Sequence, residues 1–184
     1  MEIVDEHKHM KTFHDLTRSE GMATVGVANF VRRVVTTTKP RLAVEQRSET
    51  GFTFALAQGL NDNGFGRLIA CDWDEARSAQ ISKEIASAGF PSSILVEVRS
   101  QSATESKFEG SIDLLVCSVD HEQAVRHLLP QINPFGLILL HAGKGDFAAM
   151  REFALGLDKE GVVSVILLPA TLKLVMAQRR SGRK

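Results

Sequence analysis

The stretch Leu42-Ala-Val-Glu-Gln-Arg-Ser-Glu-Thr-Gly51 decides the fold of this chain. Its apolar start predicts a strand that ends at Glu45, and the loop that closes on Gly51 leads into a helical pattern. One unit later, the apolar run Arg67-Leu-Ile-Ala-Cys-Asp72 also ends in an acid. Two strands that end in acids predict a parallel sheet with a nucleotide site at its carboxyl edge.

Strands and helices alternate along the rest of the chain. The pattern over residues 22–35 predicts a helix. This helix should end before Pro40, because proline disfavours helical geometry at the residue before it. The expected strands are Leu42–Glu45, Arg67–Cys71, Ile94–Val98, Ile112–Val116, Leu137–Leu140, Val162–Leu168 and Leu172–Ala177. The expected helices are Phe52–Leu60, one capped by Asp74 and ended by Gly89, a weakly helical segment over Gln101–Phe108, His121–Leu129, and one capped by Asp146 and ended by Gly161.

The strands are continuous apolar runs, which is typical of a parallel sheet covered on both faces. Too few residues separate the last two strands for a helix, so these strands should pair antiparallel. The sequence therefore predicts an α/β fold with a Rossmann-like, doubly wound sheet. We divide the chain into a polar N-terminal arm (1–20), a single domain (21–178) and a basic tail (179–184).

Composition excludes several classes of protein. The 184 residues carry a formal net charge of zero, which argues against a nucleic-acid binder that relies on overall basicity. No apolar run has the length of a membrane span, and the polar first residues do not resemble a signal peptide. Cys71 and Cys117 lie in expected strands and indicate buried free thiols. A cytoplasmic protein is therefore expected.

Three strings, in their order and spacing, indicate a family. They are Asp113-Leu-Leu-Val-Cys-Ser-Val-Asp-His121, Asn133-Pro-Phe-Gly-Leu-Ile-Leu-Leu-His141 and Val165-Ile-Leu-Leu-Pro169. With the strand-helix alternation, the chain resembles a class I S-adenosylmethionine-dependent methyltransferase of the small-molecule O-methyltransferase-like branch. The resemblance implies a seven-stranded sheet in the order 3-2-1-4-5-7-6, in which only strand 7 is antiparallel.

The family's first motif is an acid at the end of strand 1, followed by three glycines two residues apart. Glu45 fits the acid and Gly51 the last glycine, but Arg47 and Glu49 occupy the first two glycine positions. Glycines let the backbone approach the cofactor, so this motif is degenerate here. An Arg47–Glu49 ion pair would offset the added charges.

The resemblance also assigns cofactor contacts beyond the first motif. Asp72 matches the acid that accepts hydrogen bonds from both ribose hydroxyls, although a solvated loop acid is the alternative. Trp73 would cover the adenine ring, or pack ordinarily in its loop. Ser118, at the end of the fourth strand, completes the expected S-adenosylmethionine contacts.

Metal-dependent members of the family hold magnesium with an acid after strand 4 and an acid-amide pair after strand 5. The matching positions here are Ser118 and His141-Ala142, so we expect no metal. His121 and His141 lie at the ends of neighbouring strands, and one of them would serve as a general base for an acceptor hydroxyl. The alternative is that both are merely polar residues at strand ends.

Three functions remain open from the sequence. The first is methyl transfer from S-adenosylmethionine to a small-molecule acceptor, with weak cofactor binding. The second is a non-catalytic binding or assembly module that kept the fold and lost the cofactor. A nicotinamide-dependent oxidoreductase fits less well, because the terminal strand pair is typical of methyltransferases. No nucleic-acid or membrane partner is expected, and a homodimer stays open.

Overall fold

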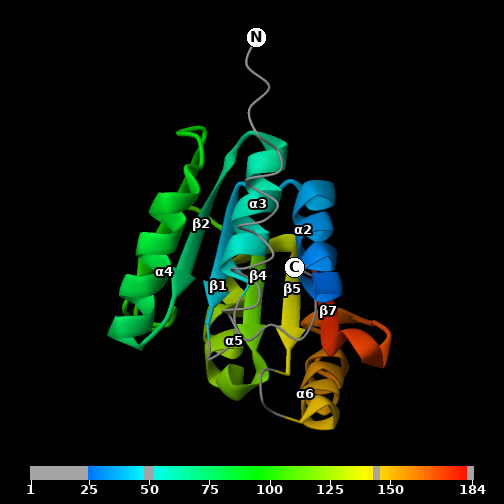
Figure 1. Ribbon diagram of the computed structural model, residues 1–184. Helices are drawn as coiled ribbons and strands as arrows, with labels where there is room; N and C mark the ends of the chain where they lie inside the picture. Colours follow the sequence, from blue (N-terminus) through cyan, green and yellow to red (C-terminus); the bar gives the residue numbers. More distant parts are fainter. Residues whose placement is uncertain (1–24, 48–51, 143–145, 182–184) are drawn as a thin grey trace.

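The computed structural model describes residues 25–47, 52–142 and 146–181. Its helices are α2 (Val25–Thr38), α3 (Thr53–Asn63), α4 (Glu75–Ala88), α5 (Glu122–Leu128) and α6 (Phe147–Lys159). Its strands are β1 (Leu42–Gln46), β2 (Gly66–Cys71), β3 (Ile94–Arg99), β4 (Ile112–Ser118), β5 (Ile132–His141), β6 (Val163–Leu167) and β7 (Leu174–Arg179). Strands and helices alternate up to β6 as the sequence predicts, except that no helix separates β3 from β4 (Figure 1).

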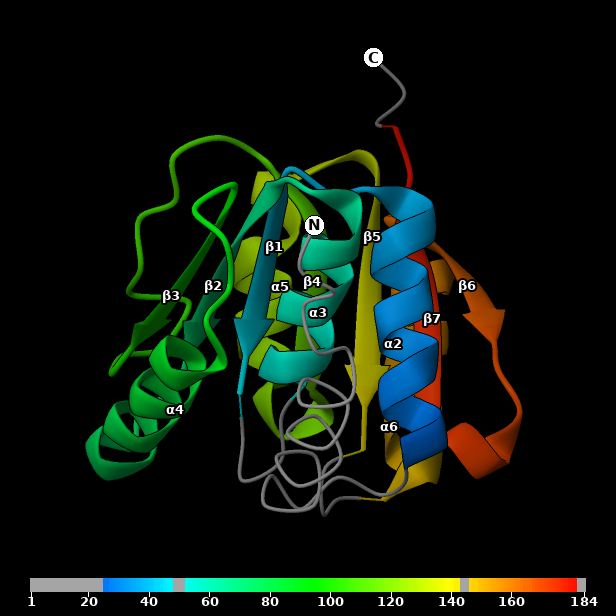
Figure 2. The same ribbon diagram turned by 45° about the horizontal axis from the view of Figure 1, so that its top comes forward.

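All seven strands join one sheet in the order β3-β2-β1-β4-β5-β7-β6 (Figure 2). β7 pairs antiparallel with both β5 and β6, and the other neighbouring strands pair parallel. The predicted strand order and the single antiparallel strand are confirmed.

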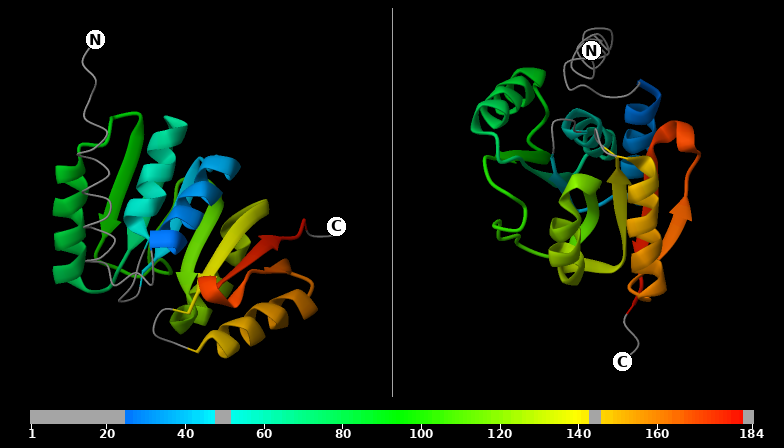
Figure 3. Two further views of the ribbon diagram at one scale, coloured as in Figure 1. Left: turned by 45° about the vertical axis from the view of Figure 1, so that its right-hand side comes forward. Right: turned by 90° about the horizontal axis from the view of Figure 1, so that it is seen from below.

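Helices cover both faces of the sheet, because successive side chains of a strand point to opposite faces. Ala43 and Leu114 pack with α2, α3 and α4, whereas Val44 and Leu115 pack with α5 and α6. The view from below shows these two helical layers with the sheet between them (Figure 3, right). Burial on both faces explains why the strands are apolar throughout.

Local signals set the helix boundaries. The Asp74 carboxylate accepts the backbone N–H of Arg77 at 2.9 Å and caps α4, and Gly89 ends that helix in the left-handed conformation. Asp146 caps α6 through the N–H of Ala148, at 2.8 Å. These predicted caps are confirmed.

Three details differ from the sequence prediction. Gln101–Phe108 forms turns and no helix, since the buried Gln46 side chain accepts the backbone N–H of Ala103 at 2.6 Å. β5 begins at Ile132 rather than Leu137, because Ile132 already pairs with Ile112 before a register shift. β7 begins at Leu174, after a 3-10 turn.

Parts of the predicted termini are described. Arg179 is the last residue of β7, and its guanidinium donates to the carbonyl of Ile132. Arg180 forms an ion pair with Asp158 at 2.7 Å. The expected arm, residues 1–20, and the final residues 182–184 lie outside the described residues. None of the described helices is long and apolar enough to cross a membrane.

Candidate functional site

The carboxyl ends of four neighbouring strands bring the candidate residues together, at the lower edge of the sheet in Figure 1. In β1, Gln46 is level with Cys71 of β2 and Cys117 of β4, so Glu45 and Asp72 lie within one residue of the ends of adjacent strands. Ser118 of β4 is level with His141 of β5. Parallel pairing therefore collects on one edge residues that lie far apart in the sequence.

Glu45 is fully buried and holds the start of α3. One carboxylate oxygen accepts the backbone N–H of Phe52, and the other accepts the Thr53 hydroxyl at 2.6 Å. A carboxylate at the first turn also interacts favourably with the helix dipole. Both oxygens of this candidate cofactor residue thus have protein donors.

Arg47, at the first expected glycine position, is 1% exposed. Its guanidinium lies 3.6 Å from Glu45 Oε2 and 3.5 Å from Asp72 Oδ2, and it donates to the Thr53 hydroxyl. Arg47 thus joins the two acids that the resemblance assigns to the cofactor. The expected partner, Glu49, and the candidate Gly51 lie outside the described residues.

Asp72 has a second cationic partner that the sequence analysis missed. The Arg77 guanidinium donates to both oxygens of Asp72, at 2.5 and 2.7 Å, which is a strong bidentate geometry. This contact raises the pKa of Arg77. Arg77 lies in the first turn of α4, which begins directly after β2, and that spacing was the available signal. Two carboxylates and two guanidiniums therefore neutralise one another in this cluster.

The Trp73 ring contacts the His121 ring. Their rings meet edge to face, with centroids 4.4 Å apart, and Trp73 remains 55% exposed. Burial lowers the pKa of His121, against the opposing effects of Asp120, the Arg47 backbone and Asp72. Its Nε2 is buried without a hydrogen-bond partner among the described residues.

His141 is buried and uncharged. Its Nε2 has no hydrogen-bond partner in the described part of the chain, and its ring meets the edge of Phe52 at 5.1 Å. Burial, with the charges of Arg47 and His121, lowers the pKa of His141 to about 3. A group that releases its proton so readily is a weak base at neutral pH, which argues against the expected general-base role for His141.

The buried His141 predicts a pH effect on stability. The native imidazole stays neutral down to a pH of about 3, whereas in the unfolded chain it is protonated below its ordinary value of about 6.5. The native state then binds fewer protons, so stability falls as the pH drops below about 6.5. Between pH 6.5 and 4.5, the free energy of unfolding of the wild type should fall by about 2 kcal/mol more than that of His141→Phe.

Urea unfolding at a series of pH values measures this difference. His127→Gln, at an exposed position on α5, is the matched control and should keep the wild-type pH dependence. If the free energy of unfolding depended on pH equally in the wild type and in His141→Phe, the buried neutral state of His141 would be contradicted.

Ser118 and Gln46 complete this edge. The buried Ser118 hydroxyl donates to the Asp120 carboxylate at 3.0 Å. Gln46 also donates to the carbonyl of Arg47 at 3.1 Å, so it ties the end of β1 to the turn after β3. Its signal was a polar side chain inside an apolar strand, which the sequence analysis passed over. That turn and the start of α5 enclose a hollow of about 470 Å³.

Metal ligands do not gather within the described residues. Over residues 25–47, 52–142 and 146–181, no three His, Cys, Asp or Glu side chains meet in a group that could hold a metal ion. Both cysteines are buried free thiols, as the sequence predicts.

Comparison with known families decides the relationship. Residues 48–142, just over half of the chain, match the family described as a methyltransferase domain. The chain belongs to this methyltransferase family. The family resemblance drawn from the sequence is thereby confirmed. No curated protein matches the chain significantly.

Solved structures with the same fold include several methyltransferases. A methyltransferase from Geobacter sulfurreducens has a TM-score of 0.71 at 13% identity, over 98% of this chain and 91% of that chain. An O-methyltransferase from Bacillus cereus in complex with SAH has a TM-score of 0.70 at 16% identity, over 97% and 93%. SAH-bound PaMTH1 from Podospora anserina has 0.70 at 16%, over 94% and 86%. At these identities the likeness establishes the fold.

Proposed function

We propose that this chain is an S-adenosylmethionine-dependent methyltransferase-like protein with a degenerate cofactor site, which binds the cofactor weakly and acts on a small-molecule acceptor. The observation that carries the proposal is the burial of Arg47 between Glu45 and Asp72. The family membership supports the cofactor class. The position of the Arg47 side chain supports weak cofactor binding, because it already pairs with both acids of the site.

The described arrangement does not fit the cofactor without rearrangement. Asp72 is fully buried, and its oxygens already accept two hydrogen bonds from Arg77 and one from the backbone N–H of Asp74, at 3.0 Å. Ribose hydroxyls would have to displace the Arg77 guanidinium, which exchanges a charged hydrogen bond for a neutral donor. The neutral cluster also offers less attraction to a sulfonium cation than two free carboxylates would.

Calorimetric titration with S-adenosylmethionine and S-adenosylhomocysteine tests the proposal. We expect dissociation constants weaker than about 100 μM, which corresponds to less than about 5.5 kcal/mol of binding free energy. Binding tighter than about 1 μM by the native chain would overturn the assignment of a degenerate site.

A second candidate is a non-catalytic binding or assembly module. The mutual neutralisation of Glu45, Arg47, Asp72 and Arg77 favours it, because these charges then stabilise the fold without a ligand. Absence of any heat with either nucleoside at millimolar concentration would select this candidate over the first. The test of the first candidate thus decides between the two.

Cofactor binding, where it is measured, should survive excess EDTA. The positions that match the magnesium ligands of metal-dependent relatives are Ser118 and His141-Ala142 here. The Ser118 hydroxyl already donates a hydrogen bond to Asp120. The titration is repeated after chelation and after addition of Mg²⁺. A rise in affinity with Mg²⁺ that EDTA reverses would show that the motifs are misaligned.

A further inference from the structure

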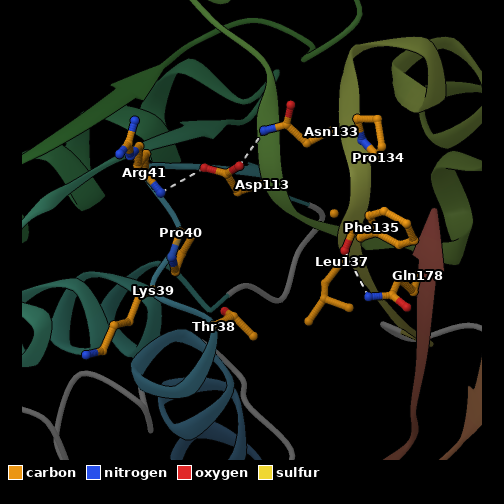
Figure 4. Close-up of a pocket in the computed structure, with 11 residues that line it drawn as sticks. Thr38, Lys39, Pro40, Arg41, Asp113, Asn133, Pro134, Phe135, Leu137 and Gln178 are labelled. Carbon is orange, nitrogen blue, oxygen red and sulfur yellow. Dashed lines mark hydrogen bonds between the residues drawn. The ribbon is translucent and has the colours of Figure 1, made fainter. Parts of the chain in front are cut away.

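A second hollow opens at the opposite edge of the sheet, where the parallel strands begin (Figure 4). Its volume is about 550 Å³, within the usual range for small-molecule sites. The α2–β1 connection forms one side, the start of β5 forms the other, and Asp113 and Gln178 close it. It shares no residue with the cluster around Asp72, so nothing below rests on the proposed function.

Phe135 stands at this hollow in an unfavourable state. Its φ is 68°, in the left-handed region that suits glycine, and the residue is 63% exposed. The Gln178 amide donates to the Phe135 carbonyl at 3.0 Å and holds this part of β5, where the pairing with β4 shifts register. Core packing does not explain a strained backbone that presents an aromatic side chain to solvent. Strained positions of this kind cluster at binding sites.

The neighbouring Gly136 shows that this irregular part of β5 requires glycine where space is short. A Cβ at Gly136 would lie 2.6 Å from Ile132 Cγ2 and 2.9 Å from the Asn133 carbonyl. Phe135 is mostly exposed and belongs to neither of the two core clusters, so it has no such packing role. Glycine would therefore satisfy the backbone at residue 135 better than phenylalanine does.

The other side of the hollow carries unpaired positive charge. In Figure 4 the Lys39 and Arg41 side chains extend away from Phe135 and Leu137, so their charges lie at the rim of the hollow, and neither forms an ion pair with another described residue. The one acidic side chain in the lining, Asp113, accepts the backbone N–H groups of Arg41 at 2.8 Å and Leu42 at 3.1 Å. Its second oxygen accepts the Asn133 amide at 2.5 Å.

We propose that this hollow binds a small organic anion with a flat aromatic group. Phe135, Pro40 and Leu137 offer the apolar surface for the ring, with Phe135 available for stacking. Lys39 and Arg41 attract the anionic group, because their two positive charges outweigh the single negative charge of Asp113 in the lining. The site is distinct from the candidate cofactor site and lies across the sheet from it.

Fluorescence titration with 8-anilinonaphthalene-1-sulfonate, an aromatic sulfonate, tests the aromatic contact. Phe135→Gly should weaken binding at least about tenfold, which corresponds to about 1.4 kcal/mol. The same variant should keep or raise its melting temperature, by about 2–4 °C, because it relieves the left-handed strain. Loss of binding therefore cannot be attributed to unfolding.

Phe65→Leu is the matched control, since Phe65 is also an exposed aromatic residue, at 40%, and does not line the hollow. It should leave the affinity unchanged. Unchanged affinity in Phe135→Gly, or an equal loss in Phe65→Leu, would overturn the proposal.

A second arm tests the charges. The double variant Lys39→Asn, Arg41→Gln removes both cations, and asparagine tolerates the left-handed φ of 49° at residue 39. Affinity for the sulfonate should fall and lose most of its salt dependence, whereas affinity for neutral N-phenyl-1-naphthylamine should not change. Lys83→Asn, on the exposed face of α4, is the control. Equal effects on the charged and the neutral probe would show that no anion is recognised.

Discussion

Replacing Asp72 with alanine is expected to lower the free energy of unfolding by about 3–5 kcal/mol, the usual cost of removing one partner of a buried ion pair. Asp72 is fully buried, and its loss leaves the 1%-exposed guanidinium of Arg47 with Glu45 alone. Arg77 contributes less to the loss, because its side chain is 24% exposed and can turn to solvent. Urea unfolding monitored by circular dichroism measures the difference.

Asp74→Ala is the control for the loss of a nearby carboxylate. Its side chain is 43% exposed, and it caps α4, so about 1 kcal/mol is expected. The double variant Asp72→Ala, Arg47→Met should lose less than the sum of the two single variants, because the stranded charge is removed with its partner. A loss below about 1 kcal/mol in Asp72→Ala would contradict the view that Arg47 depends on this carboxylate.

Local signals predicted most of the fold. Strand burial on both faces, the caps at Asp74 and Asp146, and the left-handed Gly89 are each set within a few residues, and all are confirmed. The segment 101–108 was assigned wrongly because its conformation depends on Gln46, which lies 57 positions away from Ala103. A contact of that kind leaves no periodic pattern in either segment.

The candidate site shows the same division. The sequence identified Glu45, Asp72, Ser118, His121 and His141 as strand-end residues, and the fold brings them to one edge. It could not show that Arg47 and Arg77 converge on Asp72, because side-chain direction depends on where α4 begins relative to β1. The roles of these residues toward a ligand stay predictions.

Arg47→Gly should raise the affinity for S-adenosylmethionine by about tenfold or more. The substitution restores the family residue at the first glycine position and frees Glu45 and Asp72 from a guanidinium 3.5–3.6 Å away. Arg47 lies at ion-pair distance from both acids, and a tenfold gain in affinity corresponds to about 1.4 kcal/mol. Glu45 keeps Phe52 and Thr53 as donors and Asp72 keeps Arg77, so this variant should lose less stability than Asp72→Ala.

Comparison with Arg47→Met separates charge from volume. Methionine removes the positive charge and keeps apolar bulk. A gain in affinity in both variants would assign the effect to the charge of Arg47. A gain in Arg47→Gly alone would assign it to the space that the side chain fills. Adding Glu49→Gly, at the second glycine position, should leave affinity equal or raise it further. Calorimetry on each variant supplies the values. Tight binding by the native chain that collapses in Arg47→Gly would reverse the interpretation, because Arg47 would then be the ligand-binding group rather than the residue that closes the site.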